Sequence, residues 1–251
     1  MSVPPPTGSA GTILSVAPNG TRAKSEVPHL PVSPEEVAAA AADCERIGAA
    51  VLDLEPRADT SLADVVAAVR ARTGMLVRIT ARARTETLQE LLAAGADVLA
   101  CPLDAPDEFR ADLRRGAAER GAAVHYEARG LGELDSLPAD APHVSLVFDT
   151  MFDRGSMPGD VRTFTDALGR LPGGTRFSAA GLDDAGVPVV LTALAAGGHV
   201  RVGMSDTLEY APEVPVRDNA QLVARVAGVA KIAQRPPLPA ASAREVLALV
   251  G

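Results

Sequence analysis

Short segments rich in apolar and β-branched residues alternate with amphipathic segments along nearly the whole chain. The short segments predict strands, and the amphipathic ones, whose apolar positions recur at helical spacing, predict helices between them. The predicted strands cover residues 12–17, 49–55, 75–80, 97–101, 122–127, 143–149, 175–179 and 198–203. The predicted helices cover residues 61–73, 86–94, 106–119, 159–171, 187–196, 219–233 and 241–249, with another opening at Ser33-Pro34-Glu35-Glu36 and a weaker link at 131–137.

About eight strand–helix units in 251 residues have the size and rhythm of a single (β/α)8 TIM barrel, an α/β fold. Residues 1–11 predict a flexible leader, and residues 12–251 predict the barrel domain with its C-terminal helices. A doubly wound open sheet is the main alternative. It is disfavoured because no Gly-x-Gly-x-x-Gly follows the first predicted strand and the sequence has no phosphate-loop lysine motif.

The composition narrows the class of protein and its partners. The residues are 47% apolar but only 3% aromatic, so Val, Leu and Ala must build the core. A net charge of −8 argues against a nucleic-acid partner. Cys44 and Cys101 are too few for a disulfide framework, and no apolar run approaches membrane-spanning length. With no signal-peptide pattern at the start, we expect a cytoplasmic protein without a membrane partner.

Alternation along each predicted strand separates inward-facing side chains from those that face the helices. On the second strand Leu52 and Leu54 face the helices, so Asp53 and Glu55 face inward. The same rule gives a charged interior, with carboxylates at Asp53, Glu55, Glu127 and Asp149 and cations at Arg78, Arg176 and Arg201. These charges nearly balance and could satisfy one another as ion pairs. Buried ion pairs stabilise a fold poorly, however, so the whole ring favours a functional site.

Residues 197–206 are the most informative segment of the chain. They predict a short buried strand with Arg201 facing inward, followed by an exit at Gly203 that delivers Ser205 and Asp206 to the end of the strand. A buried arginine requires an anionic partner, which is either a structural carboxylate or a substrate.

Four motifs, in order, resemble the β-keto acid cleavage enzymes, whose type member is 3-keto-5-aminohexanoate cleavage enzyme. The resemblance covers about residues 13–249 and rests on Pro18-Asn19-Gly20-Thr21-Arg22, Leu30-Pro31-Val32-Ser33-Pro34-Glu35-Glu36, Gly197-Gly198-His199-Val200-Arg201-Val202-Gly203 and Asp218-Asn219-Ala220-Gln221-Leu222-Val223. It implies a zinc-dependent (β/α)8 barrel that is usually a homo-oligomer. Such enzymes condense a β-keto acid with acetyl-CoA, then cleave the adduct to acetoacetate and a new acyl-CoA.

The resemblance also implies roles for single residues, and the metal half of the site is divergent. The family's His-x-His zinc ligands fall on Asp53-Leu54-Glu55, and a third ligand falls on Ser205. Two carboxylates and a hydroxyl suit Mg²⁺ or Mn²⁺ better than zinc. Arg78, on the neighbouring strand, could instead pair with Asp53 or Glu55 and repel a cation. Our hypothesis is that Arg78 supplies the charge of the missing metal; a carboxylate-bound metal is the alternative.

The acid–base half of the site matches the family. Arg201 and Asp206 fall on the pair that assists proton removal, with Asp206 as general base, and Glu127 is the candidate second proton carrier. Thr80 falls on the hydroxyl residue that binds the keto acid's carboxylate, but the glycines that usually follow are replaced here, one of them by Arg82. The substrate-binding candidates are Asn19, Arg78, Thr80 and Arg82.

Two other functions remain open at this point. One is a barrel that binds a small anionic metabolite without turning it over. The other is a metal-free carbon–carbon lyase, although Lys24 and Lys231 lie away from the strand ends, which argues against a Schiff-base mechanism. His125 and His199 face inward but deep, so we interpret them as core residues and not as ligands or bases.

Overall fold

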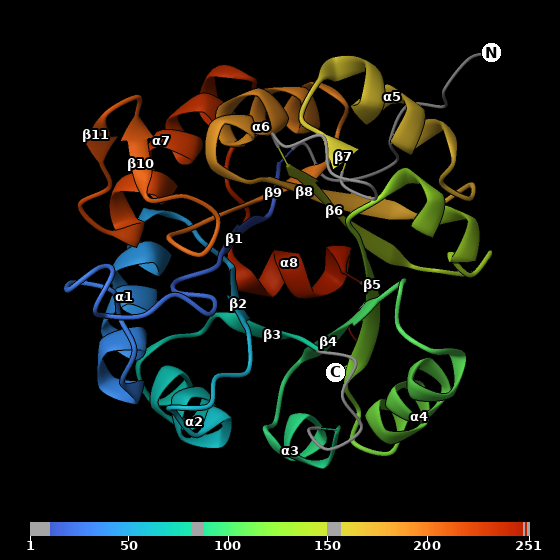
Figure 1. Ribbon diagram of the computed structural model, residues 1–251, viewed down its shortest axis with the longest axis horizontal. Helices are drawn as coiled ribbons and strands as arrows, with labels where there is room; N and C mark the ends of the chain where they lie inside the picture. The colour runs from blue at the N-terminus through green and yellow to red at the C-terminus, as the bar shows by residue number, and fades with distance from the viewer. Residues whose placement is uncertain (1–10, 82–87, 150–156, 248, 250–251) are drawn as a thin grey trace.

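Eight parallel strands close into a barrel in the computed structural model, which describes residues 11–81, 88–149, 157–247 and 249 (Figure 1). The sheet closes because β5 pairs with both β4 and β6, and β1 pairs with both β2 and β9. Closure confirms the predicted (β/α)8 barrel and excludes the open doubly wound sheet. Residues 1–10 of the predicted leader, and Arg82, lie outside the described residues. The barrel strands are β1 (Leu14–Val16), β2 (Val51–Leu54), β3 (Leu76–Thr80), β4 (Val98–Pro102), β5 (Ala123–Ala128), β6 (His143–Asp149), β8 (Arg176–Gly181) and β9 (His199–Val202).

Helices surround the barrel, except that the last, α8, lies across one end of it, and they follow the predicted order (Figure 1). They are α1 (Pro34–Ile47), α2 (Leu62–Arg72), α3 (Leu88–Ala93), α4 (Asp107–Ala118), α5 (Val161–Gly169), α6 (Gly186–Ala195), α7 (Asn219–Ile232) and α8 (Ala240–Val246). Between β5 and β6, where the helical pattern is weak, the chain forms only a 3₁₀ turn, Leu131–Ser136. Three short strands fell outside the predicted pattern: β7 (Met157–Pro158) pairs in parallel with the end of β6, and β10 (Glu209–Ala211) and β11 (Val214–Pro215) form a hairpin.

The first helix begins where its sequence signal predicts. The hydroxyl of Ser33 accepts a hydrogen bond from the backbone N–H of Glu36, and the carboxylate of Glu36 accepts one from the backbone N–H of Ser33. This reciprocal capping box satisfies two N–H groups that the first helical turn leaves without partners. Pro34 occupies the first turn, where its missing N–H costs nothing.

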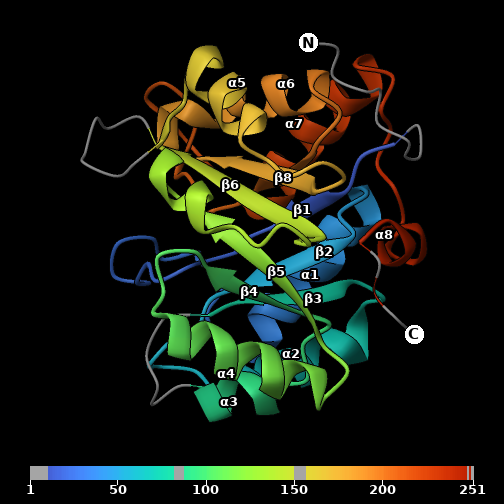
Figure 2. The same cartoon turned by 90° about the vertical axis from the view of Figure 1, so that its right-hand side faces the viewer.

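The main core lies between the barrel wall and the surrounding helices. It contains the outward-facing strand residues such as Leu52, Leu54 and Val77. A second, smaller cluster joins the amino ends of the strands to α8 through residues such as Ile13, Leu76 and Leu247. Helix α8 therefore closes one end of the barrel, and Figure 2 places it on the side opposite the loop that joins β1 to α1. No helix within the described ranges is long and apolar enough to cross a bilayer.

Candidate active site

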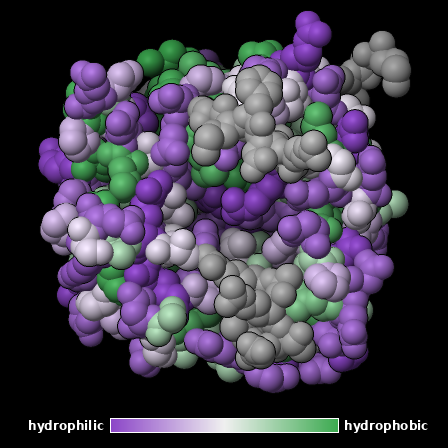
Figure 3. Space-filling model, in the orientation of Figure 1, coloured by the Kyte–Doolittle hydropathy of each residue, from purple (hydrophilic) through white to green (hydrophobic). Residues whose placement is uncertain are grey.

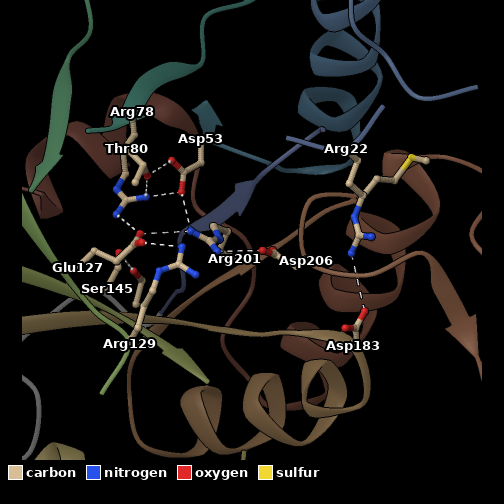
Figure 4. Close-up of polar contacts among 12 residues, drawn as sticks. Arg22, Asp53, Arg78, Thr80, Glu127, Arg129, Ser145, Asp183, Arg201 and Asp206 are labelled. Atoms are coloured by element: carbon tan, nitrogen blue, oxygen red, sulfur yellow. Dashed lines mark hydrogen bonds and ion pairs between the residues drawn. The ribbon is translucent and has the colours of Figure 1, made fainter. Parts of the chain in front are cut away.

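Charged side chains from four strands converge inside the barrel toward the carboxyl ends of those strands (Figure 4). Asp53 on β2 and Arg78 on β3 occupy paired positions of neighbouring strands, and Glu127 on β5 and Arg201 on β9 reach the same point. Each of the four is at most 6% exposed. Together with Asp206, which follows β9, we call these residues the ionic cluster. Figure 3 shows this face of the molecule hollowed at its centre, with hydrophilic residues around the hollow.

Asp53 is held by three donors. Its Oδ2 accepts hydrogen bonds from Nη1 of Arg78 and, at 3.2 Å, from Nη1 of Arg201. The hydroxyl of Thr80 lies 3.3 Å from Oδ1 of Asp53. Both carboxylate oxygens of Asp53 are therefore occupied by side chains of the barrel itself.

Glu127 is surrounded by three guanidinium groups. Nη2 of Arg78 lies 3.2 Å from its Oε2, Nη1 of Arg201 lies 3.5 Å from the same oxygen, and Nη2 of Arg129 lies 3.0 Å from Oε1. Burial alone would raise the pKa of Glu127, but the three cations outweigh burial and lower that pKa to about 2. Glu127 is consequently ionised at neutral pH and links Arg78 to Arg201.

Asp206 is the member of the cluster that keeps an oxygen without a partner. Nη2 of Arg201 donates to its Oδ1 at 2.9 Å, whereas its Oδ2 is buried with no hydrogen-bond partner among the described residues. Burial raises the pKa of Asp206, and the attraction of Arg201 only partly offsets this effect, while Asp53 and Glu55 raise the pKa further. A carboxylate with a free lone pair and a raised pKa suits a general base.

The loop that carries Asp206 is held tightly against β1. A side chain at Gly203 would place its Cβ 1.9 Å from the carbonyl oxygen of Ala17, so only glycine fits there. The N–H of Ser205 donates to the same carbonyl at 3.1 Å, and the carbonyl of Asp206 accepts from the N–H of Asp183. The glycine exit predicted from the sequence thus fixes the position of Asp206.

The residues that the sequence resemblance assigns to a metal site do not fit a divalent cation in this arrangement. Asp53 is engaged by the guanidinium groups of Arg78 and Arg201, which would repel a cation. Ser205 packs on Gly20, where an added Cβ would lie 2.3 Å from the Ser205 hydroxyl. Glu55 is half-buried at the end of β2. Within the described part of the chain, no three His, Cys, Asp or Glu side chains are grouped so that they could hold a metal.

The structure separates the other predicted site residues. Thr80 lies beside the ionic cluster, with its hydroxyl oxygen 3.3 Å from Nη1 of Arg78. The amide of Asn19 is buried and donates to the carbonyl of Pro31 at 2.8 Å, in a small cavity that Glu55 also lines. Arg82 lies outside the described residues.

Sequence reasoning missed one residue of the site and misplaced another. Arg129, with its side chain half exposed beside Glu127, continues the inward alternation of β5 by one step, which was the available signal. Arg176 was expected among the inner cations. It is instead exposed at the amino end of β8, where it donates to the carbonyl of Val246 in α8. The alternation of side chains along a strand predicts whether a residue faces into the barrel, but not how far it lies from either end of the barrel.

Three histidines lie below the cluster, toward α8. The rings of His125 and His143 are 4.6 Å apart, and those of His143 and His199 are 6.4 Å apart and stacked. Burial is the largest cause that lowers their pKa values, to about 3 for His125 and about 4 for His199, and well below the usual value for His143. All three are buried and neutral. His125 and His199 are core residues, as their depth in the strands predicts, and the structure adds His143, at the start of β6, to them.

A closed parallel barrel with acids and arginines gathered at the carboxyl ends of its strands has the layout that barrel enzymes share. The chain belongs to the β-keto acid cleavage enzyme family, whose family model matches residues 11–249. This finding confirms the family that the sequence motifs resemble.

Two kinds of relatives accompany the family match. The 3-keto-5-aminohexanoate cleavage enzyme of Acetoanaerobium sticklandii is 30% identical over 95 residues, which are 38% of this chain and 35% of that protein. The match thus spans about a third of that relative's length. ObcA, solved as a ternary complex with a C4-CoA adduct and oxalate, superposes with a TM-score of 0.67 at 16% identity, covering 88% of this chain and 68% of that chain. A type I 3-dehydroquinate dehydratase from Clostridium difficile gives 0.57 at 9% identity, covering 90% and 94%. These two likenesses concern the fold.

Proposed function

We propose that this protein condenses a β-keto acid with acetyl-CoA and releases acetoacetate and a new acyl-CoA, with Arg78 supplying the positive charge that a metal supplies elsewhere in the family. One observation carries the proposal: Asp206 is held through one oxygen by Arg201, and its other oxygen is buried with no hydrogen-bond partner among the described residues, while Arg201 also contacts Asp53, the carboxylate that pairs with Arg78. ObcA, whose structures hold oxaloacetate or a C4-CoA adduct, supports a keto acid and a CoA thioester as the reactants.

The reaction begins with the keto acid held by its carboxylate and by its β-carbonyl oxygen. The hydroxyl of Thr80 and the half-exposed guanidinium of Arg129 bind the carboxylate, and Arg78 polarises the β-carbonyl oxygen. Asp206 then removes a proton from the carbon between the carboxylate and the carbonyl. The resulting enolate is stabilised by Arg78 and Arg201, which are buried and already oriented.

Carbon–carbon bond formation and cleavage follow from that enolate. Its carbon attacks the acetyl thioester carbonyl, and CoA leaves as the thiolate. The thiolate attacks the original β-carbonyl, and the bond to that carbonyl breaks, giving the new acyl-CoA and the enolate of acetoacetate. Asp206 returns its proton to this enolate, so the acid–base cycle closes on one residue. Because its pKa is about 2, Glu127 serves to position Arg78 and Arg201, in place of the proton-carrying role expected from the sequence.

The test combines turnover with metal dependence. Purified protein is assayed with acetyl-CoA and a panel of β-keto acids, with acetoacetate and acyl-CoA both measured, before and after treatment with a chelator. We expect turnover to continue after chelation. We also expect the purified protein to contain less than one divalent metal ion per chain. Arg78→Met should lower kcat by roughly 10²–10³-fold, the loss seen when one preorganised donor is removed. Arg176→Gln, which removes an exposed arginine far from the cluster, is the control and should keep full activity.

Three results would contradict the proposal in different ways. Stoichiometric zinc required for turnover would refute the role of Arg78. Cleavage of the keto acid without CoA consumption would instead identify a lyase. Tight binding of small anions with no turnover of any panel member would identify a binding protein.

A further inference from the structure

An apolar groove lies between α6 and α7, over the carboxyl ends of β8 and β9. Its cavity volume is about 50 Å³. The wall from α6 includes Val187, Val190 and Leu191, and the wall from α7 includes Leu222 and Val226. The groove is thus formed by two helices that the active-site proposal does not otherwise use.

The floor of the groove is shared with the candidate active site. Asp206, which is 3% exposed, forms the floor of the groove together with the buried Val190 and Val226. Val187 and Leu191, which are 42% and 51% exposed, form its rim. Oδ2 of Asp206, the carboxylate oxygen of the ionic cluster that has no hydrogen-bond partner within the described part of the chain, belongs to this floor residue. The groove therefore runs from the proposed general base to the surface of the protein.

The direction of a bound keto acid follows from the arrangement of the cluster. Asp206 lies on the far side of Arg201 from Thr80, Arg78 and Glu127 (Figure 4). A carboxylate bound at Thr80 and Arg129 places the opposite end of the molecule toward Asp206. The chain beyond the β-carbonyl then needs a cavity next to Asp206, and the groove is one.

We infer that this groove binds the chain of the β-keto acid beyond its carbonyl and that it selects a short, uncharged, aliphatic chain. The inference rests on the proposed function and names its substrate class. The apolar walls exclude a charged chain, because a charge without a partner is costly to bury. Arg225, which also lines the groove, contacts Tyr210: its Nη1 donates to the Tyr210 carbonyl, its guanidinium stacks 4.6 Å from the Tyr210 ring, and its Nε is buried without a hydrogen-bond partner among the described residues.

The size of the groove limits the chain length. A cavity of about 50 Å³ is roughly a third of the ~150 Å³ cavity that accommodates benzene in an engineered protein core. It therefore holds a chain of only a few carbon atoms. Each methylene that it buries should improve affinity about fourfold until the groove is full.

Binding of unreactive analogues tests the groove separately from catalysis. Isothermal titration with 3-hydroxybutyrate, 3-hydroxypentanoate, 3-hydroxyhexanoate and 3-hydroxyoctanoate should give affinities that rise about fourfold per methylene and then level off or fall. Val226→Phe, which fills the floor, should abolish this dependence on chain length, and Val190→Ala should move the optimum to a longer chain. Val161→Phe, a matched change at a 65% exposed position of α5, should leave the series unchanged.

The outcomes distinguish failure of the groove from failure of the proposed function. Affinities that do not depend on chain length in wild-type protein would overturn the groove assignment, even if β-keto acids are turned over. Tightest binding of a dicarboxylic analogue, 3-hydroxyadipate, would also overturn it and would point to Arg225 as a carboxylate partner. A chain-length series that responds to Val226→Phe or Val190→Ala, in a protein without turnover, would keep the groove and refute the proposed reaction.

Discussion

Mild acid should destabilise this barrel through the three histidines buried beneath the ionic cluster. His125, His143 and His199 are at most 6% exposed, and burial is the largest cause of their lowered pKa values. The cations of Arg78, Arg176 and Arg235 lower them further. The folded protein therefore keeps all three rings neutral at a pH where the unfolded chain protonates them.

The sign and size of the effect follow from proton linkage. Because the folded pKa values lie below the unfolded value near 6.5, the unfolded state binds more protons as the pH falls, so stability decreases below about pH 6.5. At about pH 5, which is above the folded pKa values of about 3 for His125 and about 4 for His199, each of these two histidines costs about 2 kcal/mol, about 4 kcal/mol together, and the lowered pKa of His143 adds to the loss in the same direction. That loss is comparable with the whole stability of an ordinary domain, about 5–15 kcal/mol.

The carboxylates of the ionic cluster change the loss of stability between about pH 7.5 and 5 little. Glu127, with a pKa of about 2, loses its stabilising charge only below about pH 4.5. Asp206 has a raised pKa, so its protonation in acid favours the folded state and opposes the histidines. The change in unfolding free energy between about pH 7.5 and about pH 5 is consequently due mainly to the histidines.

Urea unfolding at the two ends of that window measures the effect. His143 is the most informative position, because neither of its ring nitrogens has a hydrogen-bond partner among the described residues. His143→Phe should remove part of the pH-dependent loss, because the substituted ring no longer binds a proton in the unfolded state, while His125 and His199 keep their share. His29→Gln changes an exposed histidine outside the barrel and should leave the loss intact. If wild-type protein is equally stable at both pH values, or if the His143 variant keeps the full loss, the explanation is wrong.

Three further predictions concern the ionic cluster and Arg129, which lies beside it. Asp206→Asn should abolish turnover while leaving Tm unchanged or higher, because the raised pKa means that the buried charge opposes folding; a large fall in Tm, measured by calorimetry, would instead make Asp206 structural. Arg78→Met should lower the free energy of unfolding, measured in urea, by about 3–5 kcal/mol, because it removes an ion-pair partner of the buried carboxylate of Asp53. The double variant Asp53→Asn/Arg78→Met should recover most of that stability but no activity. A single variant as stable as wild type would refute the coupling. Arg129→Gln should raise KM for the keto acid about tenfold with little change in Tm, since its side chain is half exposed; an unchanged KM would remove Arg129 from the substrate site.

The amino-acid sequence determined the rhythm of the barrel and the side of the sheet on which each strand residue lies. Alternation is a local property of extended backbone, and this is why the inward positions of Asp53, Arg78, Glu127 and Arg201 could be predicted. Local signals also marked the capping box at Ser33 and the weak link before β6. The family motifs at the two ends of the chain identified the family, which the match over residues 11–249 confirms.

Only the tertiary structure decided which of these charges meet. Arg78 bridges Asp53 and Glu127 from strands 25 and 49 residues away along the chain, and Arg201 reaches Asp53 across 148 residues. The same alternation placed Arg176 inside, yet it lies exposed at the opposite end of the barrel. The physical reason is that alternation fixes direction alone, while the stagger between neighbouring strands fixes height. Closure of the barrel sets that stagger and thereby turned separate inward charges into one cluster.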